Sequence, residues 1–191
     1  MYRWLRNTHL FLGLFSCLFV LMYGISSVAM VHTSWFPRRP AISESRITVS
    51  AEAASSARAL ARELMDRHGI RGELVGAQTT PDGFRFRISR PGLHHFVTYS
   101  NGSAEARVEK RVVGVIHTLS DIHHVSGLES EDWLANVWGF FIGIVSVGLI
   151  VLALTGIYLW FKIHTERLTG SILLAISLGY SLTVMLLLRT A

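Results

Sequence analysis

Six of the nine histidines lie in or near the boundaries of long apolar segments, where their ring nitrogens could bind a metal. Paired neutral imidazoles from facing helices supply both axial ligands of a b-type haem. His9 and His32 are 23 residues apart, about 34 Å along a helix, so they would serve two sites or none. The alternative is that these amphipathic rings simply tolerate the boundary between water and lipid.

The order of the apolar segments places these histidines at two levels. His9 and His164 are expected at similar depth near one face of a membrane, and the others near the opposite face. Two haem levels stacked across a bilayer would form a path for electrons. The candidate haem ligands are His9, His32, His117, His124 and His164.

One polar face precedes the second apolar segment. His117, Asp121 and His124 follow one another at helical spacing and therefore share a side of the helix. This face could bind a metal ion directly, Asp121 could orient a ligating imidazole, or the face could be solvated. His123 turns toward the apolar side with Ile116, and the choice between His123 and His124 as a ligand stays open.

The remaining histidines, His68, His94 and His95, belong to the polar part of the chain and are expected at surface or strand positions. The only cysteine, Cys17, excludes an internal disulfide, a zinc site of several cysteines and a thiolate-ligated iron–sulfur cluster.

Three uncharged stretches are each long enough to cross a bilayer, which takes about 20 helical residues. The first is read as a retained anchor, because its apolar run exceeds that of a signal peptide. The predicted organisation has a first span with a short tail, a polar module, an amphipathic helix, a second span, a loop and a third span. Their ranges are 1–35, 36–111, 112–132, 133–161, 162–169 and 170–191.

Charge is confined to the polar module and its flank. Of the 31 charged residues, 25 lie between Trp35 and Asp132, where 13 basic side chains nearly balance 12 acidic ones. This distribution excludes a purely soluble enzyme. The near-neutral insert also lacks the basic surface that a nucleic-acid partner would need. Membrane lipid is therefore the first expected partner.

Basic residues beside the spans indicate an orientation. Arg3 and Arg6 precede the first span and share a side with Lys162 and Arg167. Three arginines lie near span ends on the other side: Arg38, Arg39 and Arg189. Because the first span usually dominates, the N-terminus is predicted to be cytoplasmic and the insert and C-terminus to face outward.

The insert is predicted to be a small α+β module. Ser50 is the expected cap of a helix that stops at Gly69. Strands are expected near 84–88, 93–99 and 104–111, with turns at 81–83 and at Asn101-Gly102. No nucleophile elbow, phosphate-binding glycine loop or zinc-protease motif is present in the insert, so by motif it is not a catalytic domain.

The second span carries Gly139 and Gly143 at a spacing that suits close helix packing, followed by Gly148 and Gly156. The same glycines could instead make room for a flat cofactor against the helix.

Several short motifs give the chain a resemblance to a known family. They are Arg6-x-x-His9-x3-Gly13, Tyr99-x-Asn101-Gly102, Ile116-His117 and Leu154-Thr155-Gly156-Ile157-Tyr158-Leu159-Trp160. With them, nearly the whole chain resembles the PepSY-associated transmembrane-helix (PepSY-TM) family of bacterial inner-membrane proteins. The resemblance implies an α-helical membrane protein with three transmembrane helices and a small α+β PepSY-like periplasmic insert.

The resemblance also implies a function. Some family members are haem b reductases that deliver electrons to ferric iron or siderophores on the periplasmic side, which makes this chain a candidate reductase or a subunit of one. Quinol or a redox protein is the expected electron donor, a ferric siderophore the expected acceptor, and a homodimer the expected assembly. The alternative is a non-catalytic membrane anchor whose PepSY module binds or regulates a periplasmic protein.

Overall fold

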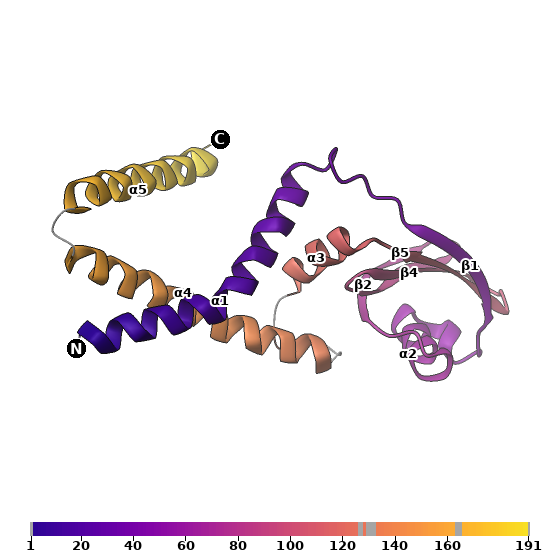
Figure 1. Cartoon of the computed structure of the whole chain (residues 1–191). Helices are drawn as coiled ribbons and strands as arrows, with labels where there is room; N and C mark the ends of the chain where they lie inside the picture. Colours follow the sequence, from indigo (N-terminus) through magenta and orange to yellow (C-terminus); the bar gives the residue numbers. More distant parts are fainter. Residues whose placement is uncertain (1, 126–127, 129–132, 163–165, 191) are drawn as a thin grey trace. The chain divides into compact units, whose positions relative to one another are not determined.

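The computed structural model describes residues 2–125, 128, 133–162 and 166–190. Five α-helices and five β-strands follow one another within these ranges, with one short 3-10 helix before the second α-helix (Figure 1). The chain divides into two compact units. One comprises Met1–Leu18 and Ile144–Ala191, and the other Phe19–Gly143.

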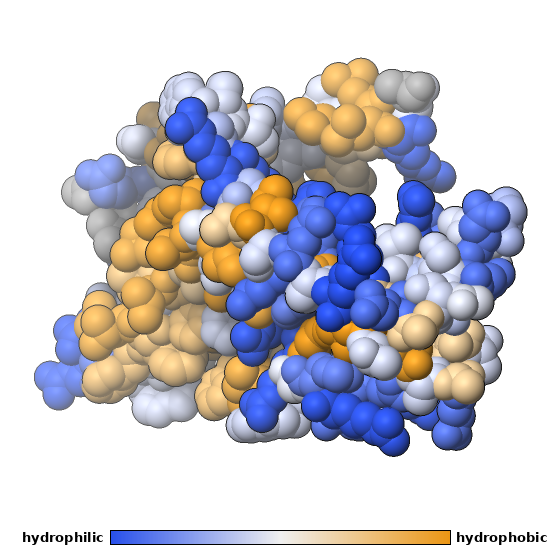
Figure 2. All heavy atoms as spheres, turned by 90° about the vertical axis from the view of Figure 1, so that its right-hand side faces the viewer, coloured by the Kyte–Doolittle hydropathy of each residue, from blue (hydrophilic) through white to orange (hydrophobic). Residues whose placement is uncertain are grey.

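Three helices are long and apolar enough to cross a membrane: α1 (Tyr2–Val31), α4 (Trp133–Lys162) and α5 (Arg167–Thr190). Large hydrophobic side chains are exposed along all three, whereas hydrophilic residues cover most of the insert (Figure 2). A helix satisfies its own backbone hydrogen bonds, so these surfaces are suited to lipid. The chain is therefore a multi-pass membrane protein.

Helix α1 lies within the predicted range 1–35, whereas α5 begins earlier than expected, at Arg167 rather than at residue 170. The predicted loop 162–169 is accordingly shortened by helical residues at both ends, and residues 163–165 lie outside the described part. The indole of Trp160 donates to the carbonyl oxygen of Glu166 (3.0 Å), which links the two helices.

Glycines allow close contact between α1 and α4 in the first unit. A Cβ on Gly148 would lie 3.6 Å from Leu12, and a Cβ on Gly13 would lie 3.6 Å from Leu152. A Cβ on Gly143 would meet no atom within 4 Å. Close packing is thus seen at Gly148 rather than at Gly143, where the sequence motif placed it.

The insert contains a five-stranded antiparallel sheet with the order β1-β5-β4-β3-β2 (Figure 1). The strands are β1 (Ala41–Thr48), β2 (Glu73–Thr80), β3 (Gly83–Arg90), β4 (Leu93–Ser100) and β5 (Glu105–Val112). The three central strands and the turns at 81–82 and 101–102 agree with the sequence-based expectation. Strands β1 and β2 were not predicted. They form the two edges of the sheet and lack a regular alternation of large apolar residues.

Helix α2 (Ala57–His68) covers one face of this sheet. Its N-terminal cap is Ser56, whose hydroxyl accepts from the amide of Ala59, so the prediction of Ser50 as the cap was wrong. Ser50 instead precedes the 3-10 helix η1 (Ala53–Ser55) and donates to Glu63, which holds the pKa of Glu63 below its ordinary value. Gly69 ends α2 in the left-handed conformation, as predicted.

A single hydrophobic core lies between α2 and the sheet. Leu60, Ala61 and Leu64 of α2 are fully buried against the apolar side chains of the three central strands. Those side chains alternate with arginines along β3, which leaves the opposite face of the sheet polar.

Helix α3 (Val115–His124) is shorter than the predicted range 112–132, because Val112 ends β5 and most residues beyond Val125 lie outside the described part. It packs beside the β3–β4 turn. Gly92 in that turn has φ +81°, and a Cβ there would lie 2.6 Å from the hydroxyl oxygen of Thr118. The turn therefore needs glycine both for its backbone conformation and for this close approach.

Candidate functional site

His9 is held by helix α4 in the first unit. Its Nδ1 lies 3.1 Å from the carbonyl oxygen of Leu152 and 3.0 Å from the hydroxyl oxygen of Thr155. The Thr155 hydroxyl itself donates to the carbonyl oxygen of Val151 (2.7 Å). Because both partners of the imidazole act as acceptors, Nδ1 carries the proton and Nε2 presents its lone pair.

Gly156 makes room for this imidazole. A Cβ at position 156 would lie 3.1 Å from Cε1 of His9, closer than most real contacts of such an atom. The Thr155-Gly156 pair therefore supplies both an acceptor for the ring and the space that the ring occupies. This is the segment that carries the most specific motif of the sequence.

His123 of α3 has the same arrangement in the second unit. Its Nδ1 lies 2.8 Å from the hydroxyl oxygen of Ser26, and that hydroxyl donates to the carbonyl oxygen of Tyr23 (2.9 Å). The serine proton is thereby used, so His123 donates from Nδ1 and keeps its lone pair on Nε2. The imidazole also packs on the Tyr23 ring, with centroids 4.4 Å apart.

The sequence-based ligand set named His124 and left the choice between it and His123 open; in the structure His124 is exposed. The sequence does contain a feature that points to His123, because this residue falls on the apolar side of α3 with Ile116. A polar ring on an apolar helix face needs a partner from another element. Here that partner is Ser26, which is buried in α1.

The other predicted ligands are placed differently. His32 is exposed and stacks on Trp35, with ring centroids 4.1 Å apart and planes at 9°. His117 is half-buried on α3. His164 lies outside the described residues. No two histidines from facing helices meet in the described part of the chain; among the histidines on helices, His9 in one unit and His123 in the other are each held by a neighbouring helix.

Haem iron requires imidazole ligands of a particular tautomer and orientation. An imidazole that donates Nδ1–H to protein oxygen and offers Nε2 is the form that ligates a metal, and the hydrogen bond fixes its tautomer and orientation. His9 and His123 each meet that requirement. Either imidazole would therefore be able to hold haem iron through Nε2, and the iron would supply a one-electron couple there.

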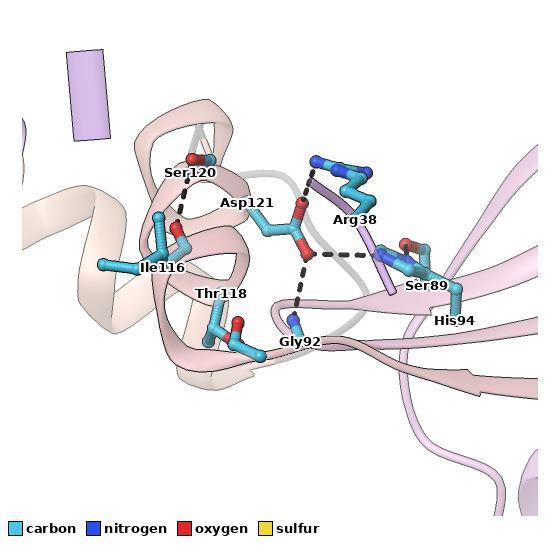
Figure 3. Close-up of polar contacts among 9 residues, drawn as sticks. Arg38, Ser89, Gly92, His94, Ile116, Thr118, Ser120 and Asp121 are labelled. Atoms are coloured by element: carbon cyan, nitrogen blue, oxygen red, sulfur yellow. Dashed lines mark hydrogen bonds and ion pairs between the residues drawn. The ribbon is translucent and has the colours of Figure 1, made fainter. Parts of the chain in front are cut away.

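The shared face of His117, Asp121 and His124 is not a metal site in the described residues, where no three metal-binding side chains gather. Asp121 turns instead to the sheet and to Arg38. Its Oδ2 accepts from the Gly92 amide (3.1 Å) and lies 3.2 Å from Nε2 of His94, and Arg38 lies 3.4 Å from Oδ1 (Figure 3). Asp121 therefore joins α3 to the module and orients neither His117 nor His124.

The polar contacts of Asp121 extend through His94 to Ser89 of β3. Its Nε2 lies near Asp121, and its Nδ1 forms a hydrogen bond of 2.6 Å with the hydroxyl group of Ser89. His94 thus lies on a strand, as expected, and its side chain also takes part in polar contacts. Helix α3 is held from two sides, by Asp121 to the sheet and by His123 to α1.

His95, the next residue of β4, is buried on the core face of the sheet, and its Nδ1 has no hydrogen-bond partner among the residues that the structure describes. Burial is the main cause that lowers its pKa, and the charges of Lys110, Arg90 and His94 lower it further. Its side chain therefore resists protonation in the folded module.

We expect acid to destabilise the module through His95. As pH falls through about 6.5, the unfolded chain takes up a proton that the folded chain resists, which costs at most about 1.4 kcal/mol per pH unit. Hydrogen-exchange protection of β4 amides in the full-length protein should therefore fall between about pH 7.5 and 5.5. His95→Leu should reduce this loss, and an unchanged pH dependence in that variant would contradict the prediction.

The fold and its oriented histidines define a class: a multi-pass membrane protein with an α+β insert between its first two spans. The chain matches the family model described as PepSY_TM-like over residues 1–190, and it belongs to that family. Neither the curated proteins nor the solved structures contain a match to it.

Proposed function

We propose that this protein carries b-type haem and passes electrons across the bacterial inner membrane to an acceptor on the periplasmic side. One observation carries the proposal. The Nδ1 atoms of His9 and His123, one in each compact unit, lie within hydrogen-bond distance of oxygen atoms of a neighbouring helix, an arrangement that would leave Nε2 available to a metal.

The chain's own residues would position the ligands. The Leu152 carbonyl and the Thr155 hydroxyl hold the His9 ring, and Ser26 holds the His123 ring. A carbonyl or hydroxyl acceptor behind an imidazole raises the basicity of its other nitrogen. Bound haem iron would supply a one-electron couple at each level.

Each level needs a second axial ligand. At the His9 level the candidates are His164 and the His9 of a second copy in a homodimer. At the His123 level the candidate on another element is His32, because His117 and His124 share helix α3 with His123. Six-coordinate iron with two histidines suits electron transfer, since no open position is left for other ligands.

The proposed direction of transfer rests on the orientation of the spans. Arg3 and Arg6 favour a cytoplasmic N-terminus, which puts the insert in the periplasm. Quinol or a redox protein would be the donor, and ferric iron or a ferric siderophore the acceptor. The protein would then be a ferric reductase or a subunit of one.

An absorption spectrum of the purified, detergent-solubilised protein tests the proposal. Protein produced with ample haem should show the sharp low-spin bands of a b-type cytochrome after reduction with dithionite. Its oxidised spectrum serves as the reference. Protein without any haem band would refute the redox function and leave the alternative, a membrane anchor whose module binds a periplasmic protein.

A further inference from the structure

The face of the sheet opposite α2 carries a second feature that the haem proposal does not use. Antiparallel pairing aligns Arg87 of β3 with Phe96 of β4, and Ser89 with His94. Paired residues point to the same side of a sheet, so these side chains share the open face. Arg111 of β5 pairs with His94 and joins them there.

This face forms part of a cavity of about 780 Å³. Four arginines line it, and we refer to Arg38, Arg87, Arg90 and Arg111 as the arginine basin. Two carboxylates, those of Glu73 and Asp121, line it as well. The basin is large enough for a small organic molecule, because typical ligand pockets measure about 300–1,000 Å³.

Phe96 holds two of the guanidinium groups in place. The guanidinium of Arg111 lies 4.3 Å from the centre of the Phe96 ring, and that of Arg87 lies 5.9 Å from it. An arginine stacked on an aromatic face keeps its N–H edge available for hydrogen bonds. The two groups therefore lose little conformational freedom when they bind an anion.

Positive charge exceeds negative charge in the basin. Four guanidinium groups face two carboxylates, and Asp121 is already engaged with Arg38 and His94. Arg111 is partly neutralised by Glu109. Nε of Arg87 is buried and has no hydrogen-bond partner among the described residues. Because this Nε is closed to solvent, an anion in the basin would instead be bound by the terminal nitrogens of the same guanidinium group.

We propose that the arginine basin binds a phosphate group, with Arg87 as its principal ligand. Guanidinium groups match the oxygen geometry of phosphate and can donate two parallel hydrogen bonds. The group would belong either to a free solute or to the headgroup of an anionic phospholipid. The proposal concerns the module alone and does not depend on haem.

Calorimetry on the full-length protein in an uncharged maltoside detergent tests this site. One titration uses inorganic phosphate at constant ionic strength, and a second uses phosphatidylglycerol. Arg87→Gln removes the principal ligand. Arg85→Gln is the matched control, because Arg85 lies on the same strand and face but outside the arginine basin.

Saturable phosphate binding that Arg87→Gln weakens at least about tenfold, and Arg85→Gln does not, would support a free solute. Saturable binding of phosphatidylglycerol alone, with the same sensitivity to Arg87, would support a lipid headgroup. Absence of binding in both titrations would overturn the proposal, as would equal effects of the two substitutions. Circular dichroism of both variants establishes that the module is folded.

Discussion

Gly83→Ala is expected to unfold the sheet of the insert. Gly83 begins β3 with φ +151°, and a Cβ there would lie 2.0 Å from the backbone oxygen of Tyr99. The neighbouring strand β4 cannot move away without breaking its pairing with β3. We expect a loss of about 3 kcal/mol or more, comparable to the whole stability of so small a module.

Gly102→Ala is the matched control for this prediction. Gly102 also has a positive φ, +77°, but a Cβ there would meet no atom within 4 Å. Only the backbone strain remains, so the loss should be about 1 kcal/mol. Hydrogen exchange of the β3 and β4 amides in the full-length protein measures both effects. Equal protection of these amides in the two variants would show that the close approach to Tyr99 does not determine the loss of stability.

The parts of this fold that could be predicted from the sequence are those that depend on residues close to one another in the chain. The three spans follow from uncharged length, the end of α2 from Gly69, and the turn before β3 from Pro81-Asp82-Gly83. The edge strands escaped prediction because their burial is weak. All but one residue of β1 is exposed, so a regular apolar alternation is not needed there.

The candidate ligands show a different limit. Spacing along a helix identifies which residues share a face, but it does not say which element that face meets. His117, Asp121 and His124 do share a polar side of α3, yet Asp121 is bound by Arg38 and by the module. His123 gains its partner from Ser26, 97 residues earlier in the chain. Contacts of this range depend on tertiary packing.

The short helix α3 joins the two proposed activities. Asp121 and His124 line the cavity of the arginine basin, and His123 lies between them in sequence with its ring toward α1. A shift of α3 along its axis would therefore move the cavity wall and the His123 ring together. This link is confined to the unit Phe19–Gly143 and is maintained by hydrogen bonds to Ser26 and Gly92 and by the contact of Asp121 with His94.

Replacement of the two oriented histidines should remove haem one level at a time. His9→Ala and His123→Ala should each lose about half of the dithionite-reduced cytochrome signal, and the double variant nearly all of it. The reason is that each imidazole belongs to a different compact unit and has its own hydrogen-bonded support. The measurement is the haem content per polypeptide together with the reduced-minus-oxidised spectrum.

His68→Ala serves as the control, since His68 is exposed at the end of α2 and should leave the spectrum unchanged. His117→Ala tests the ligand that the sequence predicts, whereas His123→Ala tests the ligand that the structure favours. If His117→Ala removes one haem and His123→Ala does not, the assignment of His123 as the ligand is wrong and the hydrogen bond to Ser26 only supports α3. If haem is present and neither substitution changes it, the outer level is not built on this helix.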